Sequence, residues 1–132
     1  MEKDLKAYFE QTEGTGVLST AGANGRVNAA VYARPHILED QTAVMIMRNR
    51  LTRKNLTENP NAAYLFIEQG QGYKGCRLYL TKTGEDTDPE RIKGLRRRCP
   101  TTDTDPDKTE LYLITFQIDQ VLPLVGTGKQ ER

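Results

Sequence analysis

Six apolar runs joined by mostly short polar connections constrain the fold of this 132-residue chain more than any other feature. Parallel neighbouring strands need a helical crossover, and most of the connections are too short to hold one. The strands should therefore be antiparallel, and closing them around one small core would remove the exposed sheet edges. We expect a mainly β fold, a six-stranded antiparallel barrel, with strands at residues 17–21, 27–33, 42–49, 62–68, 76–85 and 110–124.

Turn and helix signals lie between these runs. Asn24-Gly25 favours positive φ and indicates a hairpin between the first two strands, and Pro35 closes the second strand. Short helices are expected over residues 3–13, 52–59 and 88–99, the second with Thr52 as its N-cap and the third with Asp88. The length suits a single domain, residues 1–132, with no internal repeat.

The charge balance limits the classes of function. A net charge of +1 argues against a protein whose whole surface binds polyanions. No apolar run is long enough to cross a bilayer, and the charged start "MEKDLKAYFEQ" is unlike a signal peptide, so we expect a cytoplasmic protein. Two cysteines and one histidine are too few for an ordinary structural zinc site, and no metal is expected.

The stretch "RNRLTRKN", Arg48 to Asn55, places four cations in eight residues, where a strand gives way to a helix. A helix N-terminus offers unpaired backbone N–H groups and a partial positive charge, so it can hold a phosphate. Thr52 would add a hydroxyl donor, Arg53 a planar fork and Lys54 a point charge. These three residues predict a phosphate site, although a capped helix with ordinary surface cations remains the alternative.

Other motifs favour ordinary structural interpretations. "GQGYKG" (Gly70–Gly75) matches a dinucleotide fingerprint but lies between two strands, so it is interpreted as a loop. "GTGK" (Gly126–Lys129) lacks the first glycine and the helix of a phosphate loop. His36 has no nucleophilic or metal-binding companions and is interpreted as a surface or loop residue. "KGLRRR" (Lys93–Arg98) is expected to be the solvated, basic end of a helix.

The segments "GVLST", "NGRVNAAVY", "AVMIMRNRLTRKNLTENPNAAYLFI" and "GCRLYLTKTGE", taken in order, resemble the pyridoxamine 5′-phosphate oxidase-like family of split β-barrel flavoproteins. The resemblance covers about residues 5–85, and its most specific element is "TRKNLTENPNAAYLF". It implies a six-stranded antiparallel split β-barrel that binds FMN. It also implies a homodimer with the flavin at the subunit interface and the flavin phosphate at the basic turn.

The family pattern implies four groups of FMN-binding residues. Small side chains in the strand-two segment would let a flat ring approach the backbone, although Ala29 and Ala30 could equally be core packing. Arg77 and Tyr79 are expected to reach the cofactor from the second subunit. The groups are Thr52, Arg53 and Lys54 at the phosphate; Asn28, Ala29, Ala30 and Val31 beside the ring; Met45, Ile46, Met47 and Arg48 along the ribityl chain; and Arg77 and Tyr79 from the partner.

The resemblance predicts a dimeric, FMN-dependent oxidoreductase, in which the flavin carries the chemistry and no catalytic side chain is needed. The vitamin-oxidising members hold their substrate with a basic C-terminal segment that this chain lacks, so pyridoxamine 5′-phosphate oxidase activity is not expected. Two alternatives stay open. The barrel could bind the deazaflavin F420 or haem in place of FMN. It could also be a non-enzymatic barrel that binds nucleic acid through residues 48–54 and 93–98.

Overall fold

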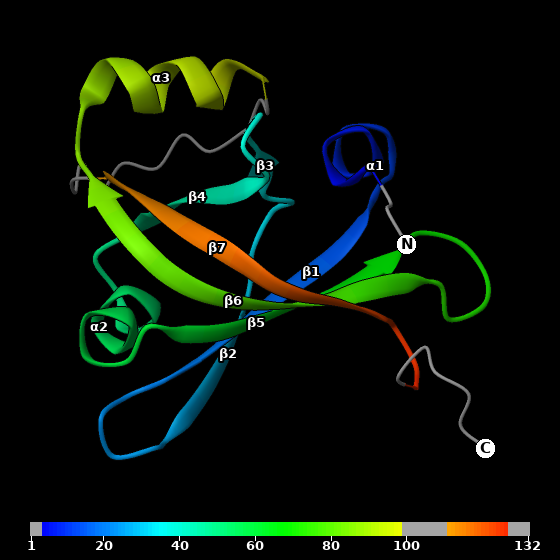
Figure 1. The fold of residues 1–132 in the computed structure, drawn as a ribbon, viewed down its shortest axis with the longest axis horizontal. Coiled ribbons are helices and arrows are strands. Elements are labelled where there is room, and N and C mark those ends of the chain that lie inside the picture. The colour runs from blue at the N-terminus through cyan, green and yellow to red at the C-terminus, as the bar shows by residue number, and fades with distance from the viewer. Residues whose placement is uncertain (1–3, 99–110, 127–132) are drawn as a thin grey trace.

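The computed structural model describes residues 4–98 and 111–126, which form one antiparallel sheet with three helices (Figure 1). The strand order is β2-β1-β5-β6-β7-β4-β3. The prediction of a mainly β, antiparallel fold is confirmed, but the number of strands is seven, not six. The strands are β1 (Gly14–Ala21), β2 (Val27–Val31), β3 (His36–Ile37), β4 (Thr42–Arg48), β5 (Asn61–Glu68), β6 (Gly75–Asp86) and β7 (Leu111–Pro123).

The additional strand, β3, is two residues long and pairs with β4 through His36 and Ile37. It lies between Pro35 and the turn at Gln41, whose φ is +67°. A strand of this length is too short to show an alternation of apolar and polar residues in the sequence. Of the interpretation of His36 as a surface or loop residue, the loop part is wrong: His36 is half-buried on a strand, opposite Val44.

One core cluster draws on almost the whole sheet. Leu18 from β1, Tyr64 and Phe66 from β5, Leu78 from β6 and Phe116 from β7 are all fully buried in it. Neighbouring and distant strands can share a cluster only if the sheet curls around it. β2 is the exception, because none of its residues is buried. The first two strands therefore form a hairpin whose second strand is an edge beside the core.

The helices cover different parts of this sheet. In α1 (Leu5–Gln11) the ring of Phe9 packs edge-on against Tyr64 and Phe66. α3 (Pro89–Arg98) covers the outer face of β4 and β7, where Ile92 forms a second cluster with Val44 and Leu113. α2 (Leu51–Glu58) contacts β1 and β2 and lies beside the β1–β2 hairpin (Figure 1). Among the described residues, no helix has the length and apolarity to cross a membrane.

The turn signals are mostly confirmed. Gly25 has φ +85°, as the hairpin turn requires, and α2 ends at Glu58, with Asn59 as its C-cap before Pro60. Asp88 accepts a hydrogen bond from the backbone N–H of Glu90 at 3.1 Å, as expected of the residue before α3. The prediction that Thr52 caps α2 is wrong, because the helix begins at Leu51 and its N-cap is Arg50.

The glycine-rich segment between β5 and β6 is a loop, as predicted. Gly70, Gly72 and Gly75 all adopt positive φ, and β6 follows directly, so no helix could receive a phosphate there. The "GTGK" motif lies outside the described residues after Gly126. The side chains of Arg96 to Arg98, on which part of the basic-helix interpretation rests, also lie outside the described part.

Candidate functional site

A cleft of about 590 Å³ separates the turn of the β1–β2 hairpin from one side of α2. This volume lies in the range of small-molecule sites, roughly 300–1,000 Å³. Two of the predicted FMN-binding residues, Asn28 and Lys54, line it. The full lining is Gly22, Ala23, Asn24, Arg26, Val27, Asn28, Leu51, Lys54, Asn55 and Glu58.

Gly22 sets the distance between the hairpin and the helix. A Cβ at this position would lie 3.1 Å from Glu58 Oε1 and 3.2 Å from Asn55 Oδ1, which is tighter than ordinary packing. Asn55 is buried, and its Nδ2 donates a hydrogen bond to Thr20 Oγ1 at 3.1 Å. The absence of a side chain at Gly22 therefore lets a backbone turn approach the polar face of α2 closely.

Glu58 carries the negative charge in this cleft. Its carboxylate accepts hydrogen bonds from the backbone N–H of Ala23 and from Lys54 Nζ, both at 2.8 Å. These bonds, that from Lys54 first, hold the pKa of Glu58 below its usual value. Arg26 and Lys54 are the cations of the lining, so the cleft combines two positive charges with one negative charge.

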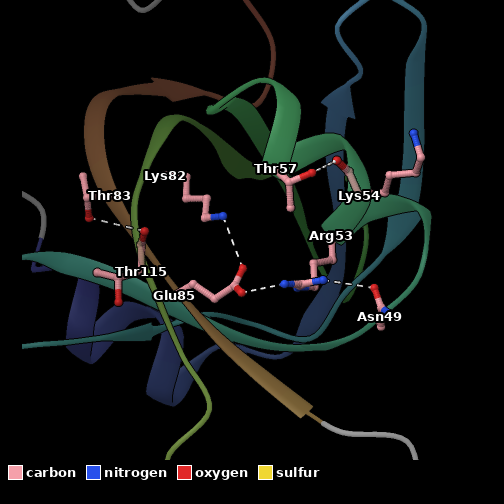
Figure 2. A network of polar contacts seen from close by, with 8 residues as sticks. All are labelled: Asn49, Arg53, Lys54, Thr57, Lys82, Thr83, Glu85 and Thr115. Atoms are coloured by element: carbon pink, nitrogen blue, oxygen red, sulfur yellow. Dashed lines mark hydrogen bonds and ion pairs between the residues drawn. The ribbon is translucent and has the colours of Figure 1, made fainter.

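Arg53 points away from Lys54, as Figure 2 shows. Its Nη2 donates to Glu85 Oε2 at 2.6 Å, its Nη1 donates to Asn49 Oδ1 at 3.1 Å, and its guanidinium lies 3.8 Å from the centroid of the Tyr112 ring. Lys82 Nζ also contacts Glu85, at 3.3 Å. Consecutive residues on a helix are rotated by about 100°. The structure therefore does not bring Arg53 and Lys54 together at one point.

Thr52 lies in the first turn of α2 and is only 4% exposed. It hydrogen bonds to the side chain of Tyr32, the residue after β2, and this bond partly offsets the effect of burial, which raises the pKa of Tyr32. The sequence analysis did not include Tyr32 among the candidate site residues. Its position directly after the strand-two segment, residues 28–31, was the signal that could have identified it. Thr52 is thus placed to join α2 to the end of β2.

The strand-two segment lies at the edge of the sheet. Ala29 and Val31 share a face with Val27, because they pair in register with Ser19, Val17 and Ala21. This face is exposed, with Val27 at 70% and Val31 at 75%. Asn28 and Ala30 point to the other side and are half-buried. The small side chains at positions 29 and 30 are therefore not packed into the core, which removes the alternative explanation for them.

The predicted strand-three segment, residues 45–48, lies on β4, and its side chains mostly pack into the interior. Met45 and Met47 are 3% and 2% exposed and belong to the main core. Ile46 packs against the cluster beneath α3. Arg48, the last residue of β4, is half-buried, like Ile46, and is separated from α2 by two residues. The predicted role of these residues along the ribityl chain remains a prediction, and Met45, Ile46 and Met47 pack into the two apolar clusters.

Arg77 and Tyr79 lie on the same sheet face as Ala29 and Val31, but on β6. Register places Ala29, Ser19, Ala63 and Tyr79 in one row across β2, β1, β5 and β6. Three strand spacings separate the ends of this row, about 14 Å. One subunit therefore does not bring these two residues next to the strand-two segment. Arg77 instead donates hydrogen bonds to the carbonyls of Pro123 and Gly126.

Comparisons with solved structures identify the same fold in flavin-related proteins. An FMN-binding protein from Syntrophomonas wolfei subsp. wolfei is 22% identical, with 92% of this chain and 84% of that chain aligned at a TM-score of 0.74. An F420 reductase is 17% identical over 92% and 98% of the two chains, at 0.72. A pyridoxamine 5′-phosphate oxidase-like protein from Lactobacillus delbrueckii is 12% identical over 92% and 93%, at 0.66.

No protein-family model and no curated protein sequence matches the chain. At these identities the structural likeness establishes the fold. The resemblance read from the sequence is therefore confirmed as the split-barrel fold of pyridoxamine 5′-phosphate oxidase-like proteins.

Proposed function

We propose that this chain is a cytosolic flavoprotein that binds FMN in the cleft between the β1–β2 hairpin and α2 and acts as an oxidoreductase. The observation that carries the proposal is the position of Lys54 and Asn28 in one cleft of a split barrel. The fold is shared with an FMN-binding protein and with an F420 reductase, which supports a flavin or deazaflavin as the cofactor.

The residues of the cleft fit a flavin phosphate. The Lys54 side chain is 66% exposed, so its ion pair with Glu58 is a surface pair and contributes little to folding. α2 has no side-chain cap hydrogen bond, and its first residue, Leu51, lines the cleft, so the positive end of the helix dipole lies beside the cleft. Arg26 and Asn28 add donors. Glu58 is the one lining group that a phosphate would repel.

FMN, when bound, supplies hydride or electron transfer, which no set of side chains here could replace. The chain's own contribution would be binding and orientation. Lys54 would hold the phosphate, and the exposed backbone beside Ala29 and Val31 would receive the flat ring. For Arg53 to contact the same phosphate, it would have to exchange Glu85 and the Tyr112 ring for the ligand.

We further propose that two copies pack through the outer face of β2, β1, β5 and β6. An exposed edge strand with apolar side chains needs a cover, and Val27, Val31 and Tyr79 are 70%, 75% and 46% exposed. A second copy on this face would bring its own Arg77 and Tyr79 toward the strand-two segment. Light scattering of the purified protein checks this proposal, and a mass of 14.9 kDa, one chain, at micromolar concentration would contradict it.

Titration of the purified protein with FMN tests the cofactor proposal directly. We expect quenching of flavin fluorescence and an increase in the thermal midpoint, because a ligand at about 100 times its Kd stabilises the native state by about 2.7 kcal/mol. Riboflavin, which lacks the phosphate, should bind more weakly, and F420 is the competing ligand. A colourless protein that gains no stability from FMN or F420 would contradict a flavin function.

Carboxylates beside the basic stretch count against the nucleic-acid alternative. Arg53 and Lys54 each already face a carboxylate, Glu85 and Glu58, which weakens the positive field that a nucleic acid would meet.

A further inference from the structure

Glu58 occupies the donors that a phosphate in this cleft would need. Lys54 Nζ and the backbone N–H of Ala23 lie on different elements, yet both donate to its carboxylate at 2.8 Å. An ammonium group and a free backbone N–H are the kinds of donor that commonly bind phosphate oxygens in proteins. Gly22 permits this arrangement, since a Cβ there would crowd Glu58 Oε1 at 3.1 Å.

No other charged group of the lining competes for this role. Lys54 faces Glu58 from α2, and Arg26 is the charged residue that the hairpin contributes to the cleft. The remaining polar side chains of the lining, Asn24, Asn28 and Asn55, are neutral. The electrostatic balance of the cleft therefore depends on whether Glu58 is charged and where its carboxylate lies.

We propose that Glu58 is the resident anion of the cleft, which the phosphate of a bound flavin nucleotide must displace from Lys54 and from the Ala23 N–H. The inference rests on the proposed function, and it makes Glu58 a specificity-determining residue. The carboxylate neutralises Lys54 while the cleft is empty of ligand. A phosphate binds only if its interactions with Lys54 and the Ala23 N–H are stronger than those of Glu58. A ligand without a phosphate does not compete for the same donors.

Displacement couples binding to protonation. In the free protein, Lys54 and Ala23 hold the pKa of Glu58 below its ordinary value. A phosphate on those donors removes this stabilisation and adds a like charge nearby, so the pKa rises when the ligand binds. Binding then takes up a proton, and the penalty imposed by Glu58 decreases as the pH falls toward the ordinary glutamate pKa of about 4.3.

The test compares wild-type protein with Glu58→Gln, which keeps an acceptor for the Ala23 N–H but removes the charge. We expect the variant to bind FMN about twofold to fivefold more tightly at pH 7, the range that exposed ion pairs support, and to bind riboflavin unchanged. The FMN affinity ratio of the two proteins should fall as the pH drops, and it should approach one only below the lowered pKa that Glu58 has in the free protein. Protonation of the phosphate itself affects both proteins alike.

Glu10→Gln is the matched control. Glu10 pairs with Lys6 on α1 with the same four-residue spacing and the same 2.8 Å distance, and neither residue lines the cleft. This variant should leave FMN affinity unchanged. Calorimetry of the wild-type protein in buffers of different ionisation enthalpy gives a second measurement that needs no variant. It should report more proton uptake with FMN at pH 5 than phosphate protonation alone explains.

The outcomes separate the two proposals. Wild-type protein that binds FMN, together with a Glu58→Gln variant of equal affinity at every pH, would overturn the role of Glu58 and leave the flavin function standing. Failure of both proteins to bind FMN would overturn the flavin function and the inference together. A variant that loses thermal stability with no change in FMN affinity would identify Glu58 as a purely structural link between the hairpin and α2.

Discussion

Arg53 and Lys54 are neighbours in the sequence, but they lie on two sides of α2 in different environments. On one side, the Arg53 side chain is 19% exposed and is held by Glu85, Asn49 and the ring of Tyr112. On the other side, the Lys54 side chain is 66% exposed and is paired with Glu58 at the edge of a cleft. Both cations have a carboxylate partner at short distance, so distance alone does not distinguish them.

Exposure does distinguish them. Water and salt screen an exposed pair, so Lys54 can exchange Glu58 for a ligand at little cost. A half-buried pair with an aromatic ring beneath the guanidinium is expensive to break, because the remaining carboxylate would keep its burial and lose its best donor. The Arg53 side therefore fixes the helix to β6 and β7, while the Lys54 side is available for binding.

Arg53→Ala should give the largest effect on folding. The substitution removes a charge-assisted bond to Glu85 and the contact with the Tyr112 ring, so we expect the free energy of unfolding to fall by about 2–3 kcal/mol. Urea denaturation followed by circular dichroism measures this change. Lys54→Ala is the matched control, with an expected loss below about 0.5 kcal/mol. Equal losses in the two variants would remove the distinction between the two sides.

Lys54→Ala should give the larger effect on ligand binding. Loss of a charge-assisted bond to a phosphate predicts at least about a tenfold weaker affinity for FMN, with riboflavin affinity unchanged. Fluorescence titration measures both ligands. If Arg53→Ala, once shown to be folded, weakened FMN binding as much, then Arg53 would leave Glu85 when the ligand binds. The family-based prediction for Arg53 would then hold in spite of its position in the structure.

The sequence predicted the sheet well because the signals were local. Alternating and continuous apolar runs located six of the seven strands, and Asn24-Gly25 and Asn59-Pro60 located ends that the structure confirms. β3 was missed because two residues cannot show a period, and its pairing depends on β4 being there to receive it. The N-cap of α2 was misplaced because Arg50 has no side-chain cap bond that a sequence pattern would reveal.

The candidate site was harder to predict, because its members meet only in three dimensions. The triplet at residues 52–54 suggested one convergent site, but the helix directs Thr52 inward, Arg53 to β6 and Lys54 to the cleft. Glu58 could have been found from its four-residue spacing to Lys54. Its contact with Ala23 could not, since nothing local links residues 35 positions apart.

The smallest expected effect is the loss of folding stability at low pH that depends on Glu85. The hydrogen bond from Arg53, with a contribution from Lys82, holds the pKa of Glu85 below its usual value despite some burial. A carboxyl group with a lowered folded-state pKa stabilises the protein above its unfolded pKa, about 4.3, and loses that contribution as the pH falls through the folded value. Glu85→Gln should therefore cost about 1 kcal/mol near pH 7.

Below the lowered folded-state pKa of Glu85, the wild-type protein and Glu85→Gln should become equally stable, because Glu85 of the folded wild-type protein is then neutral as well. Urea denaturation of both proteins between pH 7 and pH 3 measures the difference, and other acidic groups cancel because both proteins share them. A difference that stayed constant with pH would show that the Arg53 side is held by shape and the Tyr112 ring alone. The charge of Glu85 would then not distinguish the Arg53 side from the Lys54 side.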